Sequence, residues 1–224
     1  MSNWRDQTMI NLYLRGLNEV AVVGSHCGDL ALGVGGTLLG LAAHSPRLRI
    51  RALLVSGEES RCEIEERHAL AALCSNADIE LSVLDVPAGH AMLYRNEIGG
   101  ALESFRRRCT PDVLFVPQRE SVDEDHRVLA EVAAGLFPQH LRLGYEVFTS
   151  EAELSRLTIY QPLTRRVAEE KARILLKHYS SLSDRDWFDE QAFIGLARLR
   201  GVQCHNQYAE AFSAQSAVVH FDQT

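Results

Sequence analysis

Four short apolar runs, separated by segments of helical length, constrain the fold more than any other feature of this sequence. The runs cover residues 19–24, 48–55, 79–86 and 113–116, and the segments with helical periodicity between them cover residues 30–43, 63–73 and 96–108. Strands that alternate with helices are typical of βαβ units, in which helices cover both faces of a parallel sheet. The sequence therefore predicts an α/β fold, a Rossmann-like three-layer α/β/α sandwich with a mainly parallel sheet.

The second half of the chain continues this pattern less regularly. We expect a helix over residues 128–137, strands at 143–148 and around 157–160, and a long helix from about 167 to 179. After Ser180 the pattern is mixed, and three aromatic residues are expected to hold this tail against the body: Trp187, Phe188 and Phe193. No linker rich in proline, glycine or serine divides the chain, so we expect a single domain over residues 1–224.

Composition excludes several classes of protein. A hydrophobic content of 46% and a charged content of 24% are typical of globular domains. The net charge of −7 disfavours binding to nucleic acid, because contacts with the phosphate backbone need positive charge. No secretory signal or stretch of membrane-spanning length is seen, and five cysteines without framework spacing suit a reducing compartment. We therefore expect a soluble, cytoplasmic protein without membrane insertion.

Polar side chains that can bind metal ions gather where three of the predicted strands end. His26 and Asp29 follow the first run, Glu58 and Glu59 follow the second, and the segment 117–127 follows the fourth. That last segment contains three residues of interest: Asp123, Asp125 and His126. Ligands of open parallel sheets bind in the crevice outside the carboxyl ends of the strands. We therefore expect the functional site at this edge.

The glycine-rich passage after the first strand does not suit a nucleotide site. Gly33 and Gly35 fit the first two positions of a dinucleotide fingerprint, but the third position falls on Leu38, and the chain has no P-loop lysine. A metal site is the other interpretation, because catalytic zinc takes three ligands from His, Asp or Glu. His26, Asp29 and His126 could supply them. From the residues alone, hydrogen-bonded histidines without a metal remain an equal alternative.

Four segments, in order, resemble one known family. "VAVVGSHCGDLALGVGGTLLGLA" resembles the opening of the PIG-L, or LmbE-like, zinc-dependent N-acetylglucosaminyl deacetylases, whose first strand leads into A-H-P-D-D-E. "SGEESRCEIEERHALAALC", "PDVLFVPQRESVDEDHRVLAEVA" and "CHNQYAEAF" are similar to three later segments of that family and, with the first, span most of the chain. The resemblance implies one zinc ion held by His26, Asp29 and His126. It also implies removal of an acyl group from an N-acylated, sugar-like or small polar substrate.

The resemblance also shows which catalytic groups are missing. The family's general base falls on Gly28, which has no side chain, and its acid or oxyanion-supporting histidine falls on Asp123. Asp125 stands where a carboxylate orients a histidine. Glu58 or Glu59 could replace the base, and Asp123 could serve as the acid if its pKa were raised. Cys27 could act as a nucleophile or thiolate ligand, although packing against the helix start is the simpler role.

Two further residues are candidates for substrate binding. Arg67 could face an anionic substrate group, with a solvated helix face as the alternative. His205, near the C-terminal segment of the resemblance, could touch substrate or only hold the tail.

Taken together, these residues favour a divergent metal-dependent hydrolase of the deacetylase type, with zinc as its cofactor and a small-molecule substrate. Two alternatives stay open: a zinc-dependent hydratase or lyase on the same scaffold, and a non-catalytic binding partner. The sequence also leaves open whether the chain forms a homo-oligomer.

Overall fold

The computed structural model describes residues 11–45, 47–57, 60–150, 154–214 and 217–218. Within these residues seven strands form one sheet in the order β3-β2-β1-β4-β5-β7-β6. The strands are β1 (Glu19–Gly24), β2 (Arg49–Leu54), β3 (Asp78–Val83), β4 (Val113–Pro117), β5 (Leu141–Tyr145), β6 (Ile159–Leu163) and β7 (Tyr208–Ala214). The first five run parallel, whereas β7 pairs antiparallel with both β5 and β6.

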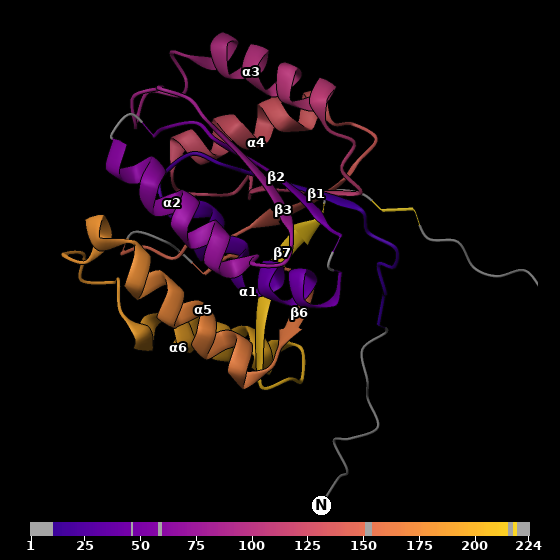
Figure 1. Ribbon diagram of the computed structural model, residues 1–224, viewed down its shortest axis with the longest axis vertical. Helices are drawn as coiled ribbons and strands as arrows, with labels where there is room; N and C mark the ends of the chain where they lie inside the picture. Colours follow the sequence, from indigo (N-terminus) through magenta and orange to yellow (C-terminus); the bar gives the residue numbers. More distant parts are fainter. Residues whose placement is uncertain (1–10, 46, 58–59, 151–153, 215–216, 219–224) are drawn as a thin grey trace, which may run out of the picture.

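Helices cover both faces of this sheet (Figure 1). One face carries α1 (Asp29–His44), α2 (Ser60–Leu73), α5 (Arg165–His178) and α6 (Glu190–Gln203), and the other carries α3 (Arg95–Arg108) and α4 (Glu124–Leu136). Each face has its own buried apolar cluster, because side chains alternate between the two sides of every strand. The predicted three-layer α/β/α sandwich with a mainly parallel sheet is confirmed. Along the described chain, none of the helices combines the length and the apolar character needed to cross a membrane.

The strongest departures from the sequence prediction lie in the C-terminal third. Residues 143–148 and 157–160 were expected as strands, but β5 and β6 are shifted to Leu141–Tyr145 and Ile159–Leu163. The tail expected to be mixed contains a regular helix, α6, and the strand β7. β7 escapes detection because its pattern is Ala-rich and includes a buried glutamate, where strand patterns normally show large apolar residues.

That glutamate, Glu210, ties β7 to the helices. Its carboxylate accepts hydrogen bonds from the backbone N–H groups of Gly36 and Thr37, each at 2.7 Å, and from the Thr37 hydroxyl at 2.6 Å. The Lys171 ammonium, on α5, donates to the same carboxylate at 2.7 Å. The negative charge is therefore buried with complete hydrogen bonding, which is what makes a carboxylate tolerable in a core.

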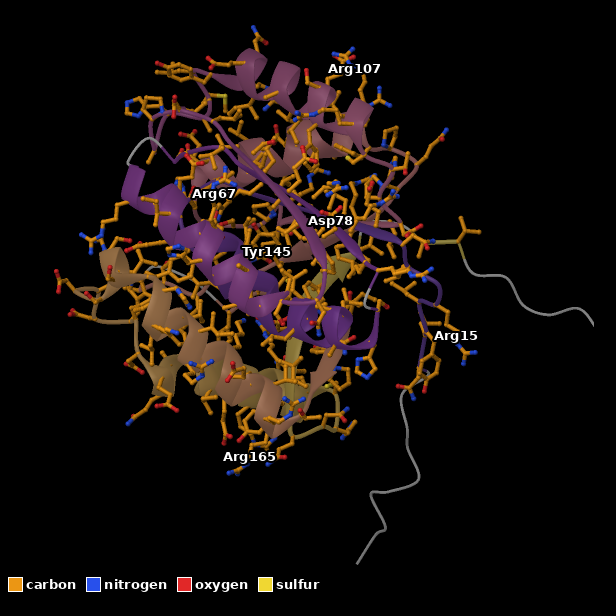
Figure 2. All side chains as sticks on the ribbon, viewed as in Figure 1. Arg15, Arg67, Asp78, Arg107, Tyr145 and Arg165 are labelled. Atoms are coloured by element: carbon orange, nitrogen blue, oxygen red, sulfur yellow. The ribbon has the colours of Figure 1, made fainter. Side chains whose placement is uncertain are left out.

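The glycines of α1 have a packing role. A Cβ on Gly33 would lie 2.2 Å from the Tyr145 ring, and one on Gly36 would lie 2.6 Å from Leu163. The Tyr145 ring cannot easily move aside, because it is fully buried and its hydroxyl donates to the Val23 carbonyl oxygen at 2.7 Å (Figure 2). The glycine-rich passage therefore allows a helix to approach the sheet closely, and it lies inside α1 where no phosphate loop could form.

Gly33→Ala should destabilise the protein by about 1–3 kcal/mol, because the added methyl group overpacks a rigid core. Gly40→Ala, on the same helix but with nothing within 4 Å of its Cβ, is the matched control. That variant should be unchanged or stabilised by up to about 1 kcal/mol through helix propensity. Urea unfolding of both variants measures the difference, and equal stabilities would contradict the packing role.

Candidate metal centre

The turn after β1 is built around the carboxylate of Asp29. Its Oδ2 accepts hydrogen bonds from the backbone N–H groups of Ser25 and His26, both at 2.8 Å. Gly28, at φ 91°, supplies the left-handed conformation that lets the chain reverse and begin α1. The turn thus places the His26 side chain at the carboxyl end of the central strand β1.

The second half of the site comes from the start of α4, beyond the end of β4. Asp123 caps this helix, since its Oδ1 accepts the backbone N–H of His126 at 3.1 Å. The His126 ring is buried, with Nδ1 3.1 Å from the Ser121 hydroxyl and Nε2 2.9 Å from Asp29 Oδ2. These two contacts aim Nε2 at the turn after β1.

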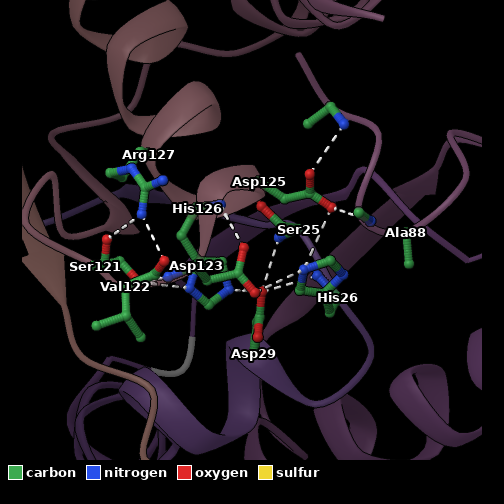
Figure 3. A network of polar contacts seen from close by, with 12 residues as sticks. Ser25, His26, Asp29, Ala88, Ser121, Val122, Asp123, Asp125, His126 and Arg127 are labelled. Atoms are coloured by element: carbon green, nitrogen blue, oxygen red, sulfur yellow. Dashed lines mark hydrogen bonds and ion pairs between the residues drawn. The ribbon is translucent and has the colours of Figure 1, made fainter. Parts of the chain in front are cut away.

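The two halves meet in one cluster (Figure 3). His26 Nε2 lies 3.2 Å from Asp123 Oδ2 and 3.5 Å from Asp125 Oδ2. The His26 and His126 ring centroids are 5.4 Å apart. His26, Asp123 and His126 each offer a ligand atom within 4.8 Å of the other two. Residues almost 100 positions apart in sequence are thereby brought together by the pairing of β1 with β4.

The cluster fits a metal ion such as zinc. Imidazole nitrogen and carboxylate oxygen are ordinary zinc donors, with bonds of about 2.0–2.2 Å, so neighbouring ligand atoms of a tetrahedral site are separated by roughly 3.3–3.5 Å. The observed separation of 3.2 Å between His26 and Asp123 is close to this value. The sequence predicted His26, Asp29 and His126 as ligands, whereas in the structure Asp123 joins the two histidines and Asp29 contacts His126.

The electrostatics of the cluster favour a cation. Burial alone would lower the pKa of His26, but the hydrogen bond to Asp123 and the charges of the nearby aspartates raise that pKa to about 9. Burial would likewise raise the pKa of Asp123, but the contact with His26 and the charge of His126 hold it well below its usual range. This shift is opposite to the raised pKa that the expected acid role of Asp123 would need.

Asp125 is fixed by backbone groups. Its Oδ2 accepts the N–H of Gly89 at 2.6 Å and its Oδ1 accepts the N–H of Ala91 at 2.9 Å, while Oδ2 also faces His26. The side chain is almost fully buried. Asp125 thus links the segment between β3 and α3 to His26, and it approaches the same nitrogen, Nε2, that faces Asp123.

The position of the missing base has its own local structure. The Gly28 N–H donates to Glu66 Oε2 at 2.8 Å, and a Cβ at Gly28 would lie 3.0 Å from Leu182 and 3.4 Å from Leu32. The positive φ would strain any other residue there. The backbone is therefore adapted to glycine, and an aspartate side chain would start against apolar groups.

Other predicted residues are not brought to the cluster. Arg67 donates to Glu63, at 2.6 Å, and to the Leu81 carbonyl oxygen, on the outer side of α2 (Figure 2). His205 is exposed in the turn between α6 and β7, at φ 59°. Contact with Cys62, together with burial, raises the pKa of Cys27, which disfavours a thiolate there. Glu58 and Glu59 lie outside the described residues.

A pocket of about 440 Å³ adjoins the cluster, with Asp123 and His126 in its wall. Sequence reasoning missed its opposite side, which includes Val147, Ser155 and Arg156. These residues belong to no recognisable motif and reach the site only because β5 lies beside β4. No signal in the sequence marks them.

Asp123→Asn should weaken zinc binding by at least about 10-fold, because loss of even an outer partner of a ligand typically costs this much. Asparagine also caps helices, so α4 should persist. Asp189→Asn is the matched control: Asp189 caps α6 through Ala192 N–H in the same way, away from the cluster. Competition with a chromophoric chelator measures the affinity. An unchanged affinity in Asp123→Asn would favour the ligand set with Asp29 instead.

Glu66→Gln should make folding less sensitive to pH. Burial raises the pKa of Glu66 from 4.5 to about 8, so its contribution to stability is present below pH 4.5 and lost as the pH rises through about 8. Between pH 5 and 8, the free energy of unfolding of the variant should therefore rise relative to that of wild type, as measured by urea unfolding with a chelator present. Glu65 is the control. Although burial opposes the shift, hydrogen bonds from Ser181 and Ser180 lower its pKa, so the stability difference between Glu65→Gln and wild type should stay constant between pH 5 and 8 and change only as the pH falls below about 4.5. Parallel pH profiles for wild type and Glu66→Gln would contradict this account.

Comparison with known proteins identifies solved structures that share this fold. No protein-family model matches the sequence, and no curated protein matches it significantly. Solved structures do match. N,N'-diacetylchitobiose deacetylase from Pyrococcus horikoshii has a TM-score of 0.71 and 17% identity, over 89% of this chain and 84% of that one. The 4-carboxy-2-hydroxymuconate hydratase GalB from Pseudomonas putida has a TM-score of 0.69 and 16% identity, over 92% and 100%.

A third match is the zinc-inhibited form of teicoplanin deacetylase Orf2, with a TM-score of 0.65 and 15% identity, over 88% of this chain and 97% of that one. At such identities the likeness concerns the fold. The chain has the fold of the PIG-L, or LmbE-like, deacetylases, as the sequence resemblance predicted.

Proposed function

We propose that this protein is a metal-dependent hydrolase that removes an acyl group from an N-acylated, sugar-like or small polar substrate. One observation carries the proposal. Two histidines and an aspartate converge at the carboxyl ends of β1 and β4, and two of the three, Asp123 and His126, also line a pocket large enough for a small molecule. This is the position at which open parallel sheets bind their ligands.

The residues of the cluster would contribute to zinc binding in different ways. His26, Asp123 and His126 would ligate it, and two further carboxylates would lie beside the ion, with Asp29 Oδ2 2.9 Å from His126 Nε2 and Asp125 Oδ2 3.5 Å from His26 Nε2. Zinc supplies Lewis-acid polarisation of a carbonyl group and a lower pKa for water. The chain's own contribution is to fix the ligands from backbone groups, so that little reorganisation accompanies binding.

The proton-accepting group needs a replacement, because Gly28 offers none. Asp125 is already engaged by two backbone N–H groups, and the Asp29 oxygen in the site accepts two backbone N–H groups and lies 2.9 Å from His126 Nε2. We assign the base to Glu58 or Glu59. The assignment is supported by a contact between the two strand ends. The Ser56 N–H donates to the Ser25 carbonyl oxygen at 2.8 Å. Ser56 comes two residues before Glu58, and Ser25 comes one residue before His26.

A hydratase is the second candidate, and the glycine at position 28 favours it. Addition of water to an activated double bond forms a C–O and a C–H bond and expels no amine, so its proton transfers, from water to the second carbon, need not use a group at this position. One of the matching structures is a hydratase by name, so the scaffold supports that chemistry in another protein.

The full-length protein loaded with zinc should release acetate from N-acetylglucosamine and leave an enoate such as fumarate unchanged. The double variant Glu58→Gln/Glu59→Gln should keep its zinc and lose about 10²–10⁴-fold in kcat, the usual contribution of one proton-transfer group. Chelated protein is the control, and metal content is measured by elemental analysis.

Other outcomes discriminate between the alternatives. Hydration of the enoate without amide hydrolysis would replace the proposal by the hydratase. Bound zinc with neither reaction across a panel of amides and enoates would indicate a binding protein. Full turnover in the double variant would remove both glutamates as the base while leaving the hydrolase in place.

A further inference from the structure

The pocket beside the cluster has two walls from different parts of the chain. One wall is the segment between β4 and α4, which includes Gln118, Glu120 and Asp123. The other wall follows β5 and includes Val147, Ser155 and Arg156. Two of the three proposed ligands, Asp123 and His126, belong to the first wall, so a substrate in the pocket contacts the second wall with the part that does not react.

The two walls differ in charge. The first carries the carboxylates of Glu120 and Asp123, whereas Arg156 is the one lysine or arginine among the described residues of the lining. The Arg156 side chain is exposed, and within the described part of the chain it makes no hydrogen bond or ion pair. A guanidinium at a pocket edge with its donors uncommitted is suited to a planar anion, which it can bind through two N–H groups.

The wall that carries Arg156 is held by hydrogen bonds from Gln118 and Arg200. The Ser155 hydroxyl accepts a hydrogen bond from Gln118 Nε2 at 2.7 Å, and the Ser155 carbonyl oxygen accepts one from Arg200 at 3.1 Å. Arg200 is 2% exposed and pairs with Glu146 at 2.7 Å. Ser155 is therefore held from both sides, and this fixes the backbone from which Arg156 extends.

Gln118 adds a polar group to the same region. It is 7% exposed, and its Oε1 has no hydrogen-bond partner among the described residues. Because this oxygen atom is itself buried, it offers no accessible acceptor to a molecule in the pocket. The polar group that the lining leaves for a ligand is therefore the Arg156 guanidinium, which has no partner among the described residues.

We infer that the substrate of this site carries an anionic group, a carboxylate or a phosphate, which Arg156 binds in the part of the pocket lined by the segment after β5. The inference rests on the proposed function and narrows its substrate class from N-acylated, sugar-like or small polar compounds to those that carry an anionic group. In the zinc-loaded protein the first wall carries the charge of the metal as well as its carboxylates, so the direction of binding depends on the attraction of the anion by Arg156 at the second wall. The acyl group then lies at the histidine end.

Calorimetric titration of the zinc-loaded protein with three related sugars tests this inference without turnover. Glucose is neutral, glucuronate carries a carboxylate and glucose 6-phosphate carries a phosphate, and none has an amide to hydrolyse. At least one of the anions should bind about 10- to 100-fold tighter than glucose, as charge-assisted hydrogen bonds do. The tighter of the two identifies the anion.

Arg156→Gln should remove most of this preference and leave glucose binding unchanged. Arg185→Gln, an exposed arginine outside the pocket lining, is the matched control and should behave as wild type. An anion preference that persists in Arg156→Gln would overturn the inference, since the anion would then be bound by the metal. Equal binding of all three sugars by wild type would overturn it as well.

The acetate-release assay separates this inference from the proposed function. Hydrolysis of neutral N-acetylglucosamine with no anion preference would leave the hydrolase standing and refute the role of Arg156. With an acidic N-acyl substrate such as N-acetylmuramate, Arg156→Gln should raise KM about 10-fold or more and leave kcat nearly unchanged, because the residue binds a part of the substrate that does not react.

Discussion

The carboxylate of Asp29 is the interaction on which the rest of the site depends. One oxygen accepts two backbone N–H groups from the end of β1 and the Nε2 contact of a histidine that begins α4. The same oxygen atom therefore stabilises the turn after β1 and joins that turn to α4. A buried carboxylate is tolerable only when its charge is compensated, so the turn and His126 depend on each other. The neighbouring pairing of β1 with β4 in the sheet makes that meeting possible.

Asp123 has two structural roles in the site. An aspartate at this point still caps α4, as its Oδ1 accepts the His126 N–H, and its second oxygen faces His26. One short side chain thus serves the helix and the cluster together. Both contacts lower its pKa, which is the opposite of the shift that an acid role would need. The resemblance places a histidine at this position, whereas this chain has a carboxylate.

The architecture was largely predictable from sequence, and the pocket was not. Strands β1 to β4 and their helices follow from apolar runs whose period and length are unambiguous, and the strand-end rule then locates His26 and His126. β7 was missed because Glu210 stands at a core position, where only the distant Gly36, Thr37 and Lys171 make it acceptable. The wall with Arg156 was missed for a similar reason: its position depends on Arg200 and Gln118, which no local pattern connects to it.

Gly28 has a consequence for how this protein could change over time. Its φ of 91°, its N–H bond to Glu66 and the apolar groups beside its Cα make one consistent local structure. A single codon change to aspartate would therefore meet conformational strain before it could offer a proton acceptor. An aspartate at this position would require the backbone of the turn to be rebuilt first. Changes to the proton-transfer chemistry of the site are therefore more accessible at positions whose backbone conformation does not require glycine.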